Sequence, residues 1–269
     1  MKKILLLSDI HSNIEALEQL KNTKYWLDDE TEIWFAGDYI DGYNQSPFSG
    51  LKVIQFVKET VLSGKGKAIL GNHDEFLTQT FKEDYNAFSI WKMNGGRRTL
   101  NQSFGISDGR LQEIIYHLEK DYGDEIKFLS TLPLYLEEGN IISVHAGVNL
   151  EVPLYKQYKD DLLWIREPYY QYNTQLNNIN NDFKGKTIVS GHTPTSYLIR
   201  NQDNNIIKEK NDNNCSRYYI DGGSKGNSVD DVSKINCLVL SLDGTEIDAF
   251  QLKSNGEIVN TKPILARLA

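Results

Sequence analysis

The sequence has little cysteine and no long apolar run. Cys215 and Cys237 are the only cysteines among 269 residues, and their spacing predicts neither a disulfide framework nor a thiolate metal site. Two isolated thiols suit a reducing compartment, so we expect a cytoplasmic protein. No stretch approaches the roughly 18 apolar residues that a membrane-spanning helix requires. The apolar run at residues 4–7 ends in Ser8-Asp9 rather than in a small-residue cleavage site, which predicts a first strand instead of a signal peptide.

The sequence also lacks an excess of positive charge. Its formal net charge is −8 at pH 7, whereas proteins that bind nucleic acids or anionic membranes present basic patches. We therefore expect neither a nucleic acid nor a membrane as partner. The length allows a sizeable core, and we find no internal repeat or domain boundary, so we predict a single domain over residues 1–269.

What the sequence does contain is five short polar blocks, each placed directly after a short apolar run of β type. The blocks are Asp9-Ile10-His11, Gly37-Asp38-Tyr39-Ile40-Asp41, Gly71-Asn72-His73-Asp74, Val144-His145-Ala146-Gly147 and Ser190-Gly191-His192-Thr193. The carboxyl ends of neighbouring strands open onto one crevice, so the blocks predict that His, Asp and Asn side chains converge there. This combination of groups is typical of a two-metal site for phosphate esters.

Each block alone has a simpler interpretation. Gly-Asp after a strand is usually a turn, and a single histidine is more often solvated or internally satisfied than a ligand. The joint pattern favours metal binding, because four of the five histidines follow predicted strands beside Gly, Asp or Asn. His117 is the exception. It lies in a predicted helix, and we expect it on the helix surface.

In these blocks the chain resembles the calcineurin-like metallophosphoesterases. The resemblance is strongest to the bacterial branch related to Ser/Thr protein phosphatases, with the symmetrical diadenosine tetraphosphate hydrolases nearby. The blocks match the family pattern D-x-H, G-D-x-x-D, G-N-H-[DE], H-[AG]-G and G-H in order, and residues 162–166 resemble the bacterial Leu-Trp-x-Arg block. The resemblance implies an α/β fold, namely a four-layer αββα sandwich in which helices flank two mixed β-sheets.

The resemblance also implies ligands for two metal ions, with Asp38 as the bridge between them. The other implied ligands are Asp9 and His11 for one ion, and Asn72, His145 and His192 for the second. Mixed nitrogen and oxygen ligands without thiolate suit Mn²⁺, Fe or Zn²⁺. In such a site the family uses direct attack by a hydroxide that bridges the two ions.

For His73 the resemblance implies a proton donor to the leaving oxygen, with Asp41 orienting the imidazole. The alternative for Asp41 is a role in the turn alone. Arg166 is the expected phosphate-binding residue, because a guanidinium fits phosphate oxygens bidentately. The alternative is a surface salt bridge with Glu167. Weaker candidates, for which solvated charge or packing explains the sequence equally well, are Arg97, Arg98 and the tyrosine-rich residues 169–172.

Two departures from the family pattern concern the substrate. Gly42 stands where the protein-phosphatase pattern has a phosphate-binding arginine, and Ser8 stands where a glycine precedes the first aspartate. We expect a metal-dependent hydrolase of phosphate monoesters that acts on a phosphorylated protein, including phosphoserine or phosphothreonine, or on a small phosphoester. Gly42 keeps open the alternative of a dinucleoside polyphosphate hydrolase or a phosphodiesterase. A non-catalytic scaffold is a third hypothesis, which the complete ligand set disfavours.

Hydrophobic periodicity places the remaining elements of the predicted fold. The predicted helices cover residues 14–27, 51–62, 74–82, 86–104 and 110–129, and Asn94-Gly95-Gly96 interrupts the fourth. Three alternating segments predict antiparallel strands that close the second sheet, at residues 218–220, 237–242 and 247–252. Polar stretches predict a loop at residues 43–50 and a hairpin tip at residues 201–214.

Overall fold

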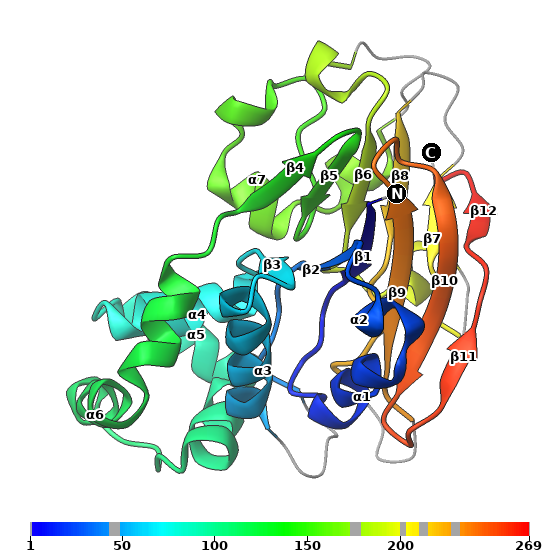
Figure 1. Cartoon of the computed structure of the whole chain (residues 1–269). Helices are drawn as coiled ribbons and strands as arrows, with labels where there is room; N and C mark the ends of the chain where they lie inside the picture. Colours follow the sequence, from blue (N-terminus) through cyan, green and yellow to red (C-terminus); the bar gives the residue numbers. More distant parts are fainter. Residues whose placement is uncertain are drawn as a thin grey trace.

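The computed structural model of the protein describes residues 2–42, 49–172, 179–199, 203–209, 215–226 and 232–268. Most of the predicted loop at residues 43–50 and part of the predicted hairpin tip at residues 201–214 lie outside these ranges. The described residues form two mixed sheets of six strands each, packed face to face and flanked by helices (Figure 1). The structure therefore confirms the predicted four-layer αββα sandwich.

The first sheet joins strands from the two ends of the chain. From edge to edge its strands are β11 (Ile258–Asn260), β10 (Glu246–Lys253), β9 (Lys234–Ser241), β1 (Lys3–Leu7), β2 (Thr31–Phe35) and β3 (Gly66–Ala68). The last three run parallel to one another, whereas β9 is antiparallel to β1 and β10 is antiparallel to β9. Strand β1 thus lies inside the sheet with a partner on each side.

The second sheet is built from the middle and the C-terminal third of the chain. From edge to edge its strands are β12 (Ile264–Ala266), β7 (Ile207–Glu209), β8 (Ser216–Tyr219), β6 (Thr187–Ser190), β5 (Ile141–Val144) and β4 (Tyr135–Glu138). Strands β5, β6 and β8 are parallel to one another. Their carboxyl ends therefore lie along one edge of this sheet.

The alternation of side chains along a strand explains the layers. In β1, Leu5 and Leu7 join the core beneath the helices, whereas Ile4 and Leu6 join the core between the two sheets. Successive side chains of a strand point to opposite faces, so a continuous apolar run is what a strand covered on both faces requires. The core between the sheets also takes side chains from both sheets, among them Trp34, Val189 and Leu238.

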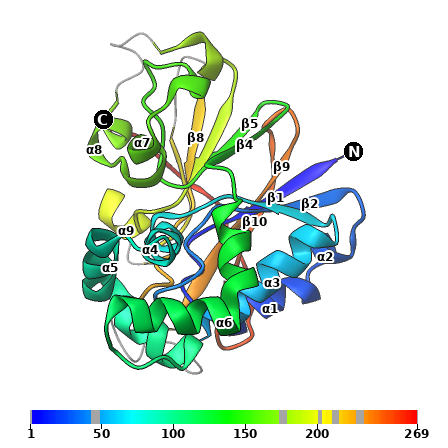
Figure 2. The ribbon, with the colours of Figure 1, turned by 90° about the vertical axis from the view of Figure 1, so that its left-hand side faces the viewer.

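Nine α-helices among the described residues cover the outer faces of the sandwich. On the first sheet lie α1 (Ile14–Glu18), α2 (Lys24–Leu27), α3 (Gly50–Leu62), α4 (Asn72–Phe81), α5 (Tyr85–Trp91) and α6 (Leu111–Ser130). On the side of the second sheet lie α7 (Lys159–Trp164), α8 (Glu167–Tyr170) and α9 (Thr195–Leu198). In the turned view α7 and α8 lie in the upper part of the molecule, and α1, α3 and α6 lie in the lower part (Figure 2). No helix in the described part of the chain has the length and apolar character needed to cross a membrane.

The helices confirm most of the periodicity, with one clear difference. The helix predicted over residues 14–27 is divided into α1, a 3₁₀ turn and α2, because Thr23 adopts an extended conformation and caps α2 by accepting a bond from Trp26 N. The predicted interruption after α5 is confirmed at Asn94 and Gly95, which lie within a π-helical turn, and a second π-helical turn follows at Thr99–Ser103. On α6, His117 is exposed, as predicted.

The prediction for the C-terminal strands is wrong in part. Of the three segments assigned to the second sheet, β8 belongs there, but β9 and β10 belong to the first sheet. Strand β9 pairs with β1, with Cys237 opposite Leu7. The alternating pattern identifies a strand and its buried face, but it carries no information about which of two apolar sheets the strand joins.

Candidate metal centre

All five polar blocks follow strands, but the strands belong to two different sheets. Asp9, Asp38 and Asn72 come after β1, β2 and β3 of the first sheet, whereas His145 and His192 come after β5 and β6 of the second. The two sets meet where His192 N donates to Asp9 Oδ2 at 3.0 Å. The predicted crevice is therefore a junction between two sheets rather than the edge of a single one.

Unusual backbone conformations concentrate in the polar blocks. Six of the eight non-glycine residues with positive φ in the described chain lie in or beside these blocks, namely Asp9, His11, Ser12, Asp38, Asp41 and His192. A non-glycine residue with positive φ is strained by about 1–3 kcal/mol. Such strain is typical of functional sites. The surrounding fold therefore holds these loops in conformations that their sequences would not adopt alone.

The carboxylate of Asp38 stands between two groups of potential ligands. Asp9, His11 and Asp38 form one group, and Asp38, His145 and His192 form the other, with all five side chains buried. His11 Nε2 lies 3.5 Å from Asp38 Oδ2, whereas His145 Nε2 lies 3.4 Å from Asp38 Oδ1. Each oxygen of Asp38 thus faces a different histidine, which is the arrangement a bridging ligand needs.

Hydrogen bonds to the backbone orient two of the histidine rings. His11 Nδ1 donates to the Ile40 carbonyl at 2.8 Å, and His145 Nδ1 donates to the Ala36 carbonyl at 2.9 Å. A proton held on Nδ1 leaves the lone pair on Nε2, which is the tautomer that a metal ligand requires. The loop after β2 therefore supplies Asp38 and also orients histidines from both sheets.

Asn72 provides a test of whether a cation fits this centre. Its Oδ1 lies 2.8 Å from His145 Nε2 and 3.0 Å from His192 Nδ1. Because His145 carries its proton on Nδ1, its Nε2 faces Asn72 Oδ1 with a lone pair, so two acceptors stand in contact. A cation between them would convert this contact into a pair of favourable ligand bonds. We call Asp9, His11, Asp38, Asn72, His145 and His192 the metal-ligand cluster.

Three buried carboxyl groups, those of Asp9, Asp38 and Asp221, lie close together in the centre. Burial raises the pKa of Asp9, Asp38 and Asp221, and the charge of Asp9 raises the pKa of the other two further. Asp221 is absent from the predicted site. It follows β8, which is parallel to β6, so its position after a strand is the signal that would have indicated it.

Asp74 holds the loop that carries Asp38. Its carboxylate accepts hydrogen bonds from the backbone N–H groups of Asp38 at 2.8 Å, Tyr39 at 2.9 Å and Gly71 at 3.1 Å. Gly71 makes this approach feasible, because a Cβ there would lie 2.2 Å from Asp38 N. Gly71 and Asp74, the first and last residues of the Gly-Asn-His-Asp block, therefore hold the preceding loop that carries Asp38.

His73 and Asp41 form a buried pair beside the metal-ligand cluster. His73 Nδ1 donates to Asp41 Oδ2 at 2.7 Å. The same carboxyl accepts bonds from Trp91 Nε1 at 2.8 Å and from the Thr99 hydroxyl. Burial raises the pKa of Asp41 to about 7, and the bonds from Thr99 and Trp91 oppose that rise. Asp41 is therefore anchored at both oxygens, which goes beyond a role in the turn alone.

The end of α5 and the segment after it contact Asp41, and the sequence pattern gave no indication of this contact. Gly95 has φ of 122°, and a Cβ at this position would lie 3.0 Å from the Asp41 Cβ. Trp91 and Thr99 on either side of that glycine donate to the carboxyl. A tryptophan in an apolar helical pattern gives no sign that its N–H has such a partner.

Arg166 lines the same cavity as the metal-ligand cluster. Its guanidinium donates to Thr193 Oγ1 at 2.5 Å, directly after His192 in the chain. Within the described residues no ion pair links it to Glu167, so the surface salt bridge is not formed. Arg97 is exposed and pairs with Asp108 at 3.4 Å, and Arg98 is exposed as well. Two of the tyrosines, Tyr169 and Tyr170, pack in the core of the second sheet.

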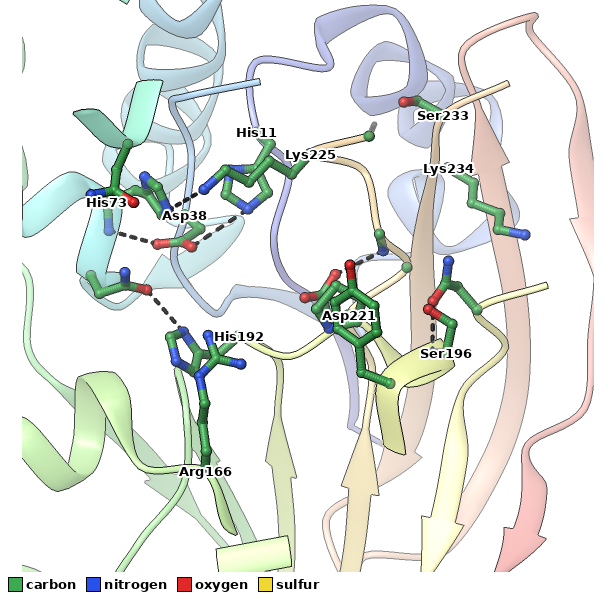
Figure 3. Close-up of a pocket in the computed structure, with 18 of the residues that line it drawn as sticks. His11, Asp38, His73, Arg166, His192, Ser196, Asp221, Lys225, Ser233 and Lys234 are labelled. Atoms are coloured by element: carbon green, nitrogen blue, oxygen red, sulfur yellow. Dashed lines mark hydrogen bonds and ion pairs between the residues drawn. The ribbon is translucent and has the colours of Figure 1, made fainter. Parts of the chain in front are cut away.

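A cavity of about 620 Å³ opens at the metal-ligand cluster and contains a lysine that the sequence analysis missed. Lys225 Nζ lies 2.7 Å from His73 Nε2, on the opposite side of the ring from Asp41. Figure 3 shows Lys225 and Arg166 reaching the cluster from opposite sides of the cavity. Lys225 belongs to the loop after β8, whose Gly222-Gly223-Ser224-Lys225 sequence resembles an ordinary turn.

Comparisons with known proteins identify relatives by family and by fold. The family model of calcineurin-like phosphoesterases matches residues 2–222. No curated protein matches the chain.

Many solved structures share the fold, and three of them illustrate the likeness. A protein described provisionally as a diadenosine tetraphosphatase has a TM-score of 0.56 and 15% identity, over 94% of this chain and 93% of its own. A serine/threonine phosphatase from Saccharomyces cerevisiae with similarity to human phosphatase PP5 has a TM-score of 0.54 and 11% identity, over 98% and 81%. A metallophosphoesterase from Sphaerobacter thermophilus has a TM-score of 0.50 and 18% identity, over 93% and 87%. At these identities the likeness shows the fold alone.

Proposed function

Because the chain belongs to the calcineurin-like phosphoesterase family, which is metal-dependent, we propose that it hydrolyses phosphate monoesters. The proposed substrates are phosphorylated proteins, including those with phosphoserine or phosphothreonine, and small phosphoesters. The observation that carries the proposal is the Asp38 carboxylate, whose two oxygens face His11 and His145 separately. A carboxylate shared by two ligand groups is what a centre with two ions needs to hold them close together.

The residues of the metal-ligand cluster fit two ions of the Mn, Fe or Zn type. We assign Asp9 and His11 to one ion, Asn72, His145 and His192 to the other, and Asp38 to both. When bound, such ions withdraw charge from the phosphoryl oxygens and lower the pKa of water. The acidic centre suits cations, because burial and mutual repulsion raise the pKa of its carboxyl groups.

His73 is the proposed proton donor to the leaving oxygen, and Asp41 is the residue that orients it. Their 2.7 Å contact supports this assignment. In the free protein burial lowers the pKa of His73 well below its ordinary value, and the charge of Lys225 adds to that effect. A phosphate dianion that enters the cavity brings negative charge beside His73, which favours the protonated imidazole. A general acid of this kind contributes about 10²–10⁴-fold to the rate.

Arg166 is the proposed phosphate-binding residue. Its side chain lines the cavity and is held beside His192 through Thr193. A guanidinium at this position offers several N–H donors to phosphoryl oxygens. The contact with Thr193 leaves the remaining donors available for such an oxygen, and the exposure of the side chain allows it to adjust.

A dinucleoside polyphosphate or another phosphodiester is the second candidate substrate. The cavity of about 620 Å³ continues past the metal-ligand cluster to Ser196, Tyr197 and Lys234. Tyr197 is 70% exposed, so its ring is accessible to a second substituent on the phosphate. Gly42, in place of a phosphate-binding arginine, supports the same alternative.

A substrate panel tests the proposal. The purified protein with added Mn²⁺ would be assayed against p-nitrophenyl phosphate, bis-p-nitrophenyl phosphate, diadenosine tetraphosphate and a phosphoserine protein. We expect the monoesters to have the highest kcat/KM, and chelation to remove the activity. A preference for diadenosine tetraphosphate or the diester would select the second candidate. Failure to hydrolyse any of them with Mn²⁺, Fe²⁺ or Zn²⁺ would favour a non-catalytic scaffold.

A further inference from the structure

We propose that Lys225 binds the phosphoryl group of the substrate and directs the enzyme toward dianionic monoesters rather than monoanionic diesters. This inference rests on the proposed function and adds a specificity-determining residue to it. Lys225 enters the cavity on the side opposite Arg166 (Figure 3). The two residues would therefore hold a phosphoryl group from both sides of the metal-ligand cluster.

The backbone beside Lys225 is fixed to the first polar block. The Ser224 hydroxyl donates to the Ile10 carbonyl at 2.9 Å and accepts from Asn13 Nδ2 at 3.1 Å. The Ser224 carbonyl accepts from the Ser233 hydroxyl at 3.1 Å. Ile10 lies between Asp9 and His11 in the chain, so the loop that carries Lys225 is tied to the loop that carries two metal ligands. The fold therefore fixes the point of the backbone from which the Lys225 side chain enters the cavity.

The ammonium of Lys225 contacts the ring nitrogen of His73 that would donate the proton to the leaving oxygen. Its Nζ is 2.7 Å from His73 Nε2, while His73 Nδ1 is occupied by Asp41. His73 Nε2 is the atom that the proposed mechanism directs to the leaving oxygen. A phosphoryl group placed for proton transfer from this atom would therefore lie within reach of Lys225, whose ammonium has three N–H donors.

The charges around Lys225 indicate that an anionic substrate would stabilise its ammonium. Burial lowers the pKa of Lys225, and the carboxylates of Asp38, Asp41, Asp221 and Asp9 raise it. With cations in the cluster, Asp9 and Asp38 would be shared with the metal and would stabilise the ammonium less. A phosphate monoester carries close to two negative charges at neutral pH, whereas a diester carries one. A cation facing the phosphoryl group therefore favours the monoester more than the diester.

The position of Lys225 also bears on the missing arginine. Gly42 directly follows Asp41, and Asp41 contacts one side of the His73 ring while Lys225 contacts the other. A cation is thus present on the far side of the same imidazole. In this chain, Lys225 would supply a positive charge for the phosphoryl group in place of a guanidinium at position 42.

The test compares two aryl substrates that share one leaving group. The variants Lys225→Met and Lys225→Arg would be assayed with p-nitrophenyl phosphate and bis-p-nitrophenyl phosphate, and the inhibition constant of inorganic phosphate would be measured. Nitrophenolate leaves without needing a proton, so an effect transmitted through His73 would be small with both substrates. We expect Lys225→Met to lower kcat/KM for the monoester about 10- to 100-fold, as for the loss of a charge-assisted hydrogen bond. The diester should lose less than about threefold.

Four readouts distinguish phosphate binding from a structural role. Inorganic phosphate should bind about 10- to 100-fold more weakly to Lys225→Met, Lys225→Arg should recover most of the loss, and metal content and Tm should stay unchanged. Lys234→Met is the matched control, because Lys234 lines the same cavity but points away from the cluster (Figure 3). The affinity of this variant for inorganic phosphate should stay unchanged.

Equal losses on both esters, or an unchanged phosphate affinity, would overturn the inference while leaving the proposed hydrolase intact. If the wild-type protein hydrolyses neither ester, but Lys225→Met still weakens phosphate binding, the proposed function fails and the phosphate-binding role of Lys225 stands. If neither hydrolysis nor a change in phosphate binding is observed, both are wrong.

Discussion

The Arg217–Glu209 pair and the metal-ligand cluster both bury charge, but they balance it in different ways. Arg217 in β8 is fully buried, and its guanidinium donates to Glu209 Oε1 at 2.6 Å and to the Tyr172 carbonyl at 3.0 Å. The other oxygen of Glu209 accepts from the Tyr219 hydroxyl at 2.9 Å. This charge is balanced by partners within the chain itself.

The metal-ligand cluster has the opposite balance. Burial raises the pKa of both Asp9 and Asp38, and the charge of Asp9 raises the pKa of Asp38 further. The histidine lone pairs point at the same region as the carboxylates. An ion pair whose charges are balanced inside the protein serves the fold. A buried cluster of carboxylates that point at a common region can bind cations, and it lowers the stability of the folded state until cations bind. The comparison separates residues kept for structure from residues kept for function.

Replacing the shared carboxylate should have the largest effect. Asp38→Asn removes the ligand that faces both groups, so we expect kcat/KM to fall by at least about 10³-fold, since metal stabilisation of charge is worth several kcal/mol. Metal content by atomic emission should fall in parallel. The Tm of the chelated variant should equal or exceed that of the chelated wild type, because a buried charge has been removed. A marked loss of stability in the chelated variant would place Asp38 with the structural pair instead.

The next largest effect should come from His73→Asn. We expect a loss of about 10²–10⁴-fold with an alkyl phosphate, whose leaving oxygen needs a proton. With p-nitrophenyl phosphate the loss should be much smaller, and metal content should be retained. Equal losses on the two substrates would show that His73 positions the substrate rather than donating a proton.

Substitutions in the Arg217–Glu209 pair should lower stability rather than activity. Glu209→Gln leaves the buried guanidinium of Arg217 without its counter-charge, and we expect a loss of about 3–5 kcal/mol in the free energy of unfolding. Urea denaturation would measure it. The double variant Glu209→Gln/Arg217→Met removes both charges and should recover part of that loss. Metal content of the folded protein should stay unchanged throughout, and a specific loss of metal would contradict the division drawn here.

A smaller effect is expected from Arg166→Ala. The guanidinium lines the cavity and its proposed role is phosphate binding, so kcat/KM for a monoester should fall by about 10- to 100-fold. Stability should hardly change, because Arg166 is exposed. A change of less than about twofold on every substrate would leave Arg166 as a surface residue.

The smallest effect concerns pH. Burial raises the pKa of Asp41 to about 7 and that of Asp74 to about 8, from the usual 3.8. Above about pH 6.5 the histidines of the unfolded chain are neutral, so the folded protein without metal binds more protons there than the unfolded chain, and its stability should fall as pH rises toward 8. Thermal melts of the chelated protein should show a Tm that declines by several degrees from about pH 6.5 to pH 8. A Tm that rises over this range would contradict the raised pKa values.

The sequence predicted the polar blocks and the strands before them, and its resemblance to a known family implied the four-layer architecture. For the blocks and their strands, residue type and position were sufficient, because a β-strand, its buried face and its carboxyl end are local properties of the chain. Asp38 and His145 could be singled out in this way. The same reasoning would have extended to Asp221 if β8 had been recognised as parallel to β6.

Only the tertiary structure decided which strands share a sheet and which distant side chains meet. Strand β9 joined the first sheet by pairing with β1, and β10 joined it by pairing with β9. Lys225 reaches His73 across 152 positions of the sequence, and Trp91 reaches Asp41 across 50. Such contacts depend on how two sheets and their loops pack, and hydrophobic periodicity records burial but not the identity of the partner. The sequence by itself determined the chemistry available at the strand ends, and the packing of the two sheets determined its geometry.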